Sequence, residues 1–136
     1  MTATADNRTA TCWCGQLRAE CEGEPFRVSV CHCLDCKRRS GSAFAMQARW
    51  PVEAVTITGE AREYVHVAES GNAASFHSCP ICSATLWYRS EQMPEAIAIP
   101  VGNFADPAFP APIYSVFEER KCGWLEIAGD GIEHFG

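Results

Sequence analysis

Seven of the nine cysteines in this 136-residue chain fall into three short clusters, and their sulfur atoms are the strongest candidates for chemistry. The clusters are Cys12 with Cys14, then Cys31 with Cys33 and Cys36, and finally Cys79 with Cys82. Thiolates this close in sequence can converge on one ion, and zinc is the usual metal in a tetrahedral sulfur site. The chain shows no apolar secretory leader, so we expect a reducing, cytoplasmic compartment where clustered thiols bind metal.

Two pairings could complete a four-sulfur site, and the spacing leaves both open. The near pairing joins Cys12 and Cys14 to two cysteines of the middle cluster. The far pairing joins them to Cys79 and Cys82 and closes a loop of about 65 residues. Closing that loop costs roughly 4 kcal/mol plus a constant, which is less than the roughly 10–16 kcal/mol that structural zinc contributes in small peptides. Loop length therefore does not exclude the far pairing.

The far pairing would leave Cys31, Cys33 and Cys36 as a separate site with three ligands. Three protein ligands with an open fourth position are typical of a chemically active zinc. Such an ion can bind and deprotonate an incoming thiol or water. The middle cluster is therefore a candidate active site.

Candidates for a fourth ligand that would close this site are His32, His77 and Cys122. Neighbouring side chains in an extended segment point to opposite sides, so we expect His32 to point away from the cysteines beside it. We interpret His77 as a strand residue and Cys122 as a small buried hydrophobe. His66 and His134 have no partner in the sequence and are interpreted as ordinary structural or surface residues.

A basic run, Lys37-Arg38-Arg39, follows the middle cluster directly and is followed by Ser40. These cations could attract the carboxylates of a glutathione-like substrate, and Ser40 could donate a hydrogen bond to it. The alternative is an ordinary solvated loop. The formal net charge of −6 argues against nucleic acid as a partner. The apolar runs are too short to cross a membrane, so no membrane partner is expected.

The motif Cys79-Pro80-Ile81-Cys82 also resembles a thioredoxin-type redox motif. That interpretation requires a strand before the motif and a helix after it. Residues 83–88 read as a turn and then a strand, which favours metal binding over redox chemistry.

Short segments of alternating apolar and polar residues must position these clusters. We expect strands at 17–22, 26–31, 44–50, 55–58, 64–67, 75–78, 85–88 and 96–101. Residues 34–41 are expected as one helical turn or a loop that stops at Gly41. The apolar residues Val116, Trp124, Leu125 and Ile127 suggest a final segment packed on the core.

These segments predict a mostly β fold: a small, zinc-stapled domain of several short, coiled antiparallel sheets with about eight to ten strands. We expect a single domain over residues 1–136, with its core at about 11–127 and a lead-in at 1–10.

Together, the clusters and their surroundings resemble one known family. The matching stretches are Cys12-Trp13-Cys14-Gly15, Cys31-His32-Cys33-Leu34-Asp35-Cys36, Ser40-Gly41-Ser42-Ala43-Phe44, Gly59 with Tyr64, and Phe76-His77-Ser78-Cys79-Pro80-Ile81-Cys82 followed by Leu86. The combined pattern is similar to the glutathione-dependent formaldehyde-activating enzyme family, which includes centromere protein V-like proteins.

The resemblance implies a structural zinc with four ligands: Cys12, Cys14, Cys79 and Cys82. It also implies a second, labile zinc at an active site, where the catalytic cysteines are Cys31, Cys33 and Cys36. In the namesake activity, glutathione adds to formaldehyde to give S-hydroxymethylglutathione, and the enzyme is classed as a carbon–sulfur lyase. Two departures stand out: Ser83 occupies a position where the family usually has glycine, and residues 112–124 match loosely.

Three hypotheses follow. The first is a zinc-dependent carbon–sulfur lyase-like enzyme that acts on an adduct of a small thiol such as glutathione. The second is a non-catalytic, zinc-bound interaction module, for which the four tryptophans would supply a surface. The third is a thiol or metal sensor that releases zinc on oxidation. A homodimer is compatible with each of them.

Overall fold

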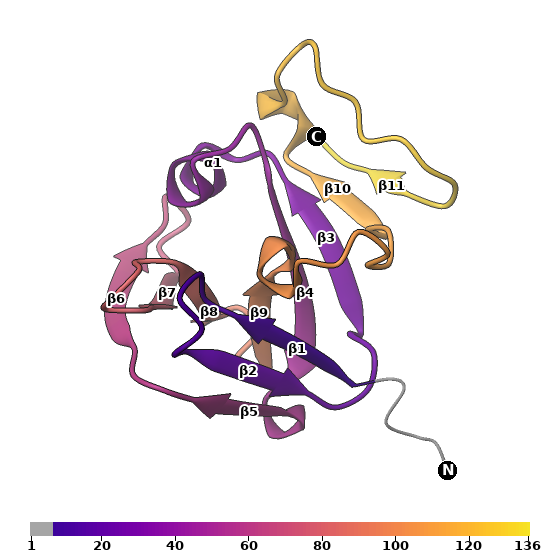
Figure 1. The fold of residues 1–136 in the computed structure, drawn as a ribbon. Helices are drawn as coiled ribbons and strands as arrows, with labels where there is room; N and C mark the ends of the chain where they lie inside the picture. Colours follow the sequence, from indigo (N-terminus) through magenta and orange to yellow (C-terminus); the bar gives the residue numbers. More distant parts are fainter. Residues whose placement is uncertain (1–6) are drawn as a thin grey trace.

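Strands make up most of the regular structure in the computed structural model, which describes residues 7–136 (Figure 1). Residues 1–6, part of the predicted lead-in, lie outside the described residues. The described part contains eleven strands, one α-helix and three short 3₁₀ helices. The prediction of a mostly β fold is therefore confirmed.

A small antiparallel sheet contains three strands in the order β1 (Arg8–Thr11), β2 (Arg18–Cys21) and β5 (Val55–Thr58). In β2, Ala19 and Cys21 are buried while Arg18 and Glu20 are exposed, as the alternation in the sequence predicts. Strand β1 begins inside the stretch expected as a lead-in, so residues 8–10 belong to this sheet.

A larger sheet contains the other eight strands. Their order is β11 (Glu133–His134), β10 (Tyr114–Val116), β3 (Arg27–Cys31), β4 (Ala45–Pro51), β9 (Ala96–Pro100), β8 (Thr85–Ser90), β7 (Ala73–Ser78) and β6 (Arg62–Val67). Neighbouring strands are antiparallel except at β10, which pairs in parallel with both β3 and β11. Because β6 comes last in the strand order, it forms one edge of the sheet.

The only α-helix among the described residues, α1 (Leu34–Ser40), follows β3 and lies above the end of the sheet that carries β6 and β7 (Figure 1). Cys33 caps its start, because its sulfur accepts the backbone N–H of Cys36 at 3.3 Å. Gly41 ends it with a φ of 67°, a conformation that glycine adopts without strain. The predicted stop at Gly41 is confirmed, and the helical alternative for residues 34–41 is the one that forms.

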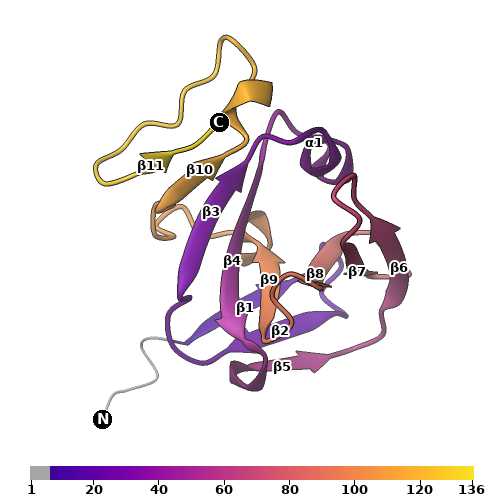
Figure 2. The ribbon, with the colours of Figure 1, turned by 180° about the vertical axis from the view of Figure 1, so that it is seen from behind.

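The core lies between the small sheet and the central strands of the large one. Figure 2 shows both sheets from behind. Trp50, Leu17, Leu86 and Ile99 are its largest fully buried apolar side chains. The same cluster contains three cysteines, which are Cys12, Cys21 and Cys79. Two of these belong to the predicted four-sulfur site, so that site is built into the edge of the core.

The predicted core-packing segment near the C-terminus is wrong for Trp124, whose side chain is 77% exposed. Leu125 and Ile127 are only half-buried, in the irregular stretch between the 3₁₀ helix η4 (Glu118–Arg120) and β11. Apolar residues at these spacings indicate a preference for burial, but they do not show that the rest of the fold offers a surface to cover them.

Two further 3₁₀ helices lie between strands: η2 (Val52–Ala54) joins β4 of the large sheet to β5 of the small one, and η3 (Val101–Phe104) lies between β9 and β10 of the large sheet. Between residues 7 and 136, no helix has the length and apolar character needed to cross a membrane.

Candidate functional site

The turn between β1 and β2 and the turn between β7 and β8 bring four cysteines together. All four sulfur atoms, from Cys12, Cys14, Cys79 and Cys82, lie within 4.8 Å of one another. The sulfur of Cys14 is 3.7 Å from that of Cys12 and 3.7 Å from that of Cys79. Four sulfurs at about 2.3 Å from a central zinc would be separated by about 3.8 Å, so this donor set fits zinc. The structure therefore groups the cysteines by the far pairing.

Backbone N–H groups in the two turns point at the cysteine sulfurs. Leu17 donates to the sulfur of Cys12 at 3.3 Å, and Ile81 donates to that of Cys79 at 3.3 Å. Burial raises the pKa of Cys79, but hydrogen bonds from the Cys82 and Ile81 backbone and from the Gln16 side chain outweigh it and lower the pKa to about 6. The turn thus favours the thiolate, which is the form that binds metal.

Gln16 is a site residue that the sequence analysis missed. Its side-chain Nε2 donates to the Cys79 sulfur at 3.0 Å and to the Glu60 carbonyl at 2.8 Å, and its Oε1 accepts the Glu60 N–H at 3.0 Å. The backbone at Gly59 packs directly against the backbone of Gln16, because a Cβ on Gly59 would lie 2.1 Å from the Gln16 carbonyl oxygen. Gln16 therefore fixes the connection between β5 and β6 against the four-cysteine turn.

Replacing Gln16 with alanine is expected to weaken zinc binding at the four-cysteine site by about 10–100-fold, because residues that orient metal ligands have effects of that size. Competition with a chromophoric zinc chelator measures the change. Gln92, an exposed glutamine that follows β8, offers the matched control as Gln92→Ala. Equal zinc affinities of Gln16→Ala and Gln92→Ala would contradict this role.

Ser83 adopts a φ of 70° in the second turn of the four-cysteine site, where its N–H donates to the Cys79 carbonyl at 2.9 Å. Side chains other than glycine cost roughly 1 kcal/mol in this left-handed region. Ser83→Gly is therefore expected to stabilise the zinc-loaded protein by about 0.5–1 kcal/mol in urea unfolding. A loss of stability in Ser83→Gly would mean that the serine hydroxyl stabilises the protein by more than the backbone strain destabilises it.

The second cysteine group lies where β3 passes into α1. Sulfur atoms of Cys31, Cys33 and Cys36 lie within 4.8 Å of one another, and in the described part of the chain no histidine, carboxylate or further cysteine completes the group. Hydrogen bonding from Cys31 lowers the pKa of Cys36 to about 6, aided by Cys33 and the charge of Arg39 and opposed by burial. The pKa of Cys31 is raised, because it donates to Cys36 and is buried. The cluster therefore favours one thiolate and could hold a metal ion with three ligands.

The three candidates for a closing ligand lie elsewhere. His32 is fully buried with its Nε2 at 3.0 Å from the hydroxyl of Ser115, and burial lowers its pKa. The ring of His77 stacks on Trp87 in the sheet, with centroids 3.6 Å apart. The sulfur of Cys122 lies 3.8 Å from the amine of Lys37 and is half-buried rather than buried as predicted.

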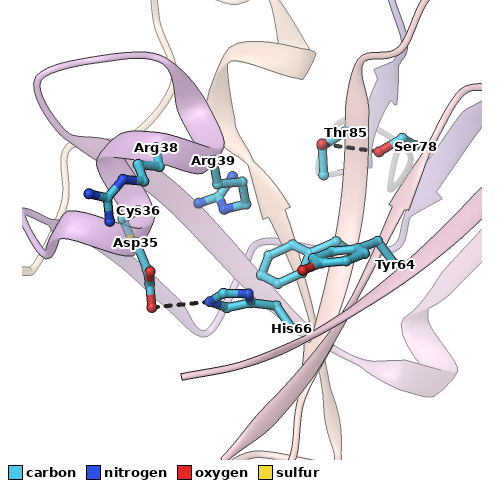
Figure 3. Close-up of a pocket in the computed structure, with 9 residues that line it drawn as sticks. Asp35, Cys36, Arg38, Arg39, Tyr64, His66, Ser78 and Thr85 are labelled. Atoms are coloured by element: carbon cyan, nitrogen blue, oxygen red, sulfur yellow. Dashed lines mark hydrogen bonds and ion pairs between the residues drawn. The ribbon is translucent and has the colours of Figure 1, made fainter. Parts of the chain in front are cut away.

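A cavity of about 330 Å³ opens beside the three-cysteine group (Figure 3). Helix α1 forms one wall, strand β6 another, and strands β7 and β8 the third. The lining residues are Asp35, Cys36, Arg38, Arg39, Tyr64, His66, Phe76, Ser78 and Thr85. His66 Nε2 lies 3.3 Å from Asp35 Oδ2, so the residue expected to have no partner forms a polar pair at the cavity wall.

The basic run is part of a helix rather than a solvated loop, and its members point in different directions. Arg38 and Arg39 line the cavity, whereas Lys37 donates to the Arg120 carbonyl at 2.6 Å. Ser40 donates its hydroxyl to the Cys36 carbonyl at 2.8 Å. Of the four predicted substrate contacts, the two arginines lie at the cavity beside the cysteines.

Asp35, Tyr64 and His66 were not singled out as site residues from the sequence. The alternation in β6 places Tyr64 and His66 on one face, and both line the cavity. Such alternation is common to all strands, so it did not indicate which face would meet α1. The thioredoxin-type interpretation of Cys79 and Cys82 is not supported, because strand β8 follows the motif where a helix is required.

Three comparisons with known proteins bear on this arrangement. A family model described as "Glutathione-dependent formaldehyde-activating enzyme" matches residues 7–120. A crystal structure of a Rhodobacter sphaeroides protein is similar in fold, with a TM-score of 0.57 at 17% sequence identity, covering 94% of this chain and 99% of that chain. No curated protein sequence matches this chain.

Proposed function

The chain belongs to the glutathione-dependent formaldehyde-activating enzyme family, and on that premise we propose that it is a zinc-dependent carbon–sulfur lyase-like enzyme, similar in activity to S-(hydroxymethyl)glutathione synthase. The observation that carries the proposal is the three-cysteine group, which lacks a fourth ligand within residues 7–136 and adjoins a cavity. The proposed catalytic residues are Cys31, Cys33 and Cys36.

The proposed reaction joins a small thiol to an aldehyde. The sulfur–carbon bond forms, the carbonyl π bond breaks, and the thiol proton ends on the oxygen; the reverse direction cleaves the adduct. Zinc held by the three cysteines would lower the pKa of an incoming thiol and so supply the thiolate at neutral pH. Cys36 is one of the residues that line the cavity, so both reactants can meet beside the three-cysteine group.

The basic run provides the counter-charge for a thiol such as glutathione. Arg38 and Arg39 lie at the cavity, and a guanidinium can bind a carboxylate through two hydrogen bonds. Lys37 and Ser40 would have to release the Arg120 and Cys36 carbonyls before they contacted a substrate. We therefore assign the main carboxylate contacts to the two arginines.

Two measurements on the zinc-loaded protein test this proposal. The first is zinc per chain before and after dialysis against millimolar glutathione, for which we expect two ions falling to one. The second is the rate of S-hydroxymethylglutathione formation, followed by NMR exchange between formaldehyde and its adduct. A zinc content fixed at two with no rate above the uncatalysed reaction would contradict the enzyme and favour an interaction module. A content fixed at one would favour a thiol sensor.

One observation favours the interaction module as a second candidate. Each turn of the four-cysteine site presents an apolar side chain to solvent, because Trp13 is 92% and Ile81 is 73% exposed. A homodimer formed through this face would dissociate in Trp13→Ser, which light scattering can measure. A wild-type chain that is monomeric at all concentrations would contradict the dimer.

A further inference from the structure

The cavity beside Cys36 is larger than a one-carbon aldehyde requires. Its volume is about 330 Å³, whereas a water molecule takes up about 30 Å³ of liquid and formaldehyde, with two non-hydrogen atoms, roughly twice that. Sites for small organic molecules begin at roughly 300 Å³. The cavity therefore has room for a group of many more atoms next to the proposed reacting centre.

Most of the cavity surface is apolar, and two of its lining residues are aromatic. Tyr64 comes from the edge strand β6, and Phe76 comes from β7 beside it. The ring of Phe76 packs on Tyr88 with centroids 4.8 Å apart, so its position is held from behind. Aromatic rings favour offset or edge-to-face contacts with another flat ring. Glutathione, which carries amides and charges along its length, matches such a surface poorly.

Two charged residues of the wall, Arg39 and Asp35, already contact other side chains of the protein. The guanidinium of Arg39 lies 5.0 Å from the ring centre of Tyr88 and 5.5 Å from that of Phe76. Asp35 engages one nitrogen of His66 at 3.3 Å. That contact orients the imidazole and leaves its other nitrogen to accept a hydrogen bond (Figure 3).

We propose that this cavity binds the organic group of an aromatic aldehyde, so that the adduct formed or cleaved here is larger than S-hydroxymethylglutathione. The inference rests on the proposed thiol–aldehyde chemistry and names its aldehyde. The ring of the aldehyde packs against Phe76 and Tyr64. The hydroxyl of the adduct donates to the free nitrogen of His66, while the thiol part extends toward Arg38 and solvent.

Alternation in β6 supplies a matched pair of variants. Tyr64 lines the cavity, whereas Val65 lies on the other face of the strand, in a separate hollow with Arg89 and Glu91. Both side chains are more than half exposed, so neither replacement by alanine removes core packing. Tyr64→Ala takes away one aromatic wall, and Val65→Ala controls for the loss of a bulky residue from the same strand.

The first experiment measures binding to the zinc-loaded full chain by amide chemical shifts. The probe is benzyl alcohol, which has the size of benzaldehyde and does not react with lysines, and ethanol is the reference. We expect saturable shifts at Tyr64, His66, Phe76 and Thr85 with benzyl alcohol. The dissociation constant should rise about tenfold in Tyr64→Ala and stay within about twofold in Val65→Ala. Absence of saturable shifts at these residues would overturn the inference.

The second experiment compares benzaldehyde, acetaldehyde and formaldehyde as partners of glutathione. We expect kcat/KM for benzaldehyde to exceed that for acetaldehyde by about tenfold, and Tyr64→Ala to abolish this advantage. Turnover of formaldehyde with no binding or turnover of the aromatic compounds overturns the inference and leaves the proposed function standing. Absence of turnover with every aldehyde overturns the proposed function and, with it, the assignment of the cavity.

Discussion

Replacing Cys79 with alanine is expected to lower the melting temperature by at least about 15 °C and to remove one zinc per chain. Cys79 is 1% exposed and belongs to both the core and the four-cysteine group. Structural zinc contributes roughly 10–16 kcal/mol in small peptides, against a total stability of about 5–15 kcal/mol for an ordinary domain. Each 1 kcal/mol corresponds to about 2–8 °C at this chain length. Elemental analysis and thermal melts followed by circular dichroism provide the measurement.

Cys21→Ala is the matched control for this prediction. Cys21 is as buried as Cys79, but it lies alone in β2, and burial raises its pKa to about 12, so it is a neutral thiol. Its replacement removes one buried sulfur without affecting a metal, and we expect a loss of about 1–2 kcal/mol with zinc content unchanged. If both variants lost the same stability, the four-cysteine site would not hold the fold together through metal.

Cys33→Ser is expected to reduce thiol–aldehyde turnover at least about a hundredfold while leaving the fold intact. The substitution takes one sulfur from the three-cysteine group, and even residues that only orient metal ligands cost about 10–100-fold. It spares α1, because serine is a good N-cap and can accept the Cys36 N–H as the cysteine sulfur does at 3.3 Å. Steady-state rates with glutathione and zinc per chain measure the outcome.

Cys122→Ser controls for the loss of a nearby thiol. Its sulfur lies 3.8 Å from the Lys37 amine, close to α1, but it is not part of the three-cysteine group. We expect its turnover and its zinc content to match the wild type. Retention of full turnover in Cys33→Ser, with a circular dichroism spectrum equal to that of Cys122→Ser, would show that the three-cysteine group is not the catalytic site.

Local patterns in the sequence predicted most of the strands. The segment 55–58 coincides with β5, and 26–31 and 96–101 each come within one residue of β3 and β9. Each has alternating or β-branched residues and ends near glycine or proline, which are properties of the segment itself. The prediction that Trp124 packs on the core was wrong because burial is not a property of the segment itself. It depends on whether another element covers the residue, and Trp124 is exposed.

In the candidate site, too, the local features were predicted from the sequence and the long-range contacts were not. Close spacing within each of the three cysteine clusters is a local property, so the sequence indicated that the clusters bind metal. The pairing of Cys12 with Cys79 was open from spacing and followed only from a family resemblance, because it joins turns of two different sheets. His66 and Asp35 lie 31 residues apart, in an edge strand and a helix, and nothing local to either predicts that they meet.

The sequence by itself therefore determined the type of fold, the clustering of the cysteines and the family of this protein, because each is encoded in neighbouring residues or in their order along the chain. The tertiary structure brought together the two cysteine turns that spacing alone left unpaired, and only it showed that Gln16 contacts Cys79 and that α1 and β6 enclose a cavity. The physical reason is that these contacts depend on how the two sheets and the helix pack together. Short-range propensity and periodicity describe one segment at a time and contain no information about its distant neighbours.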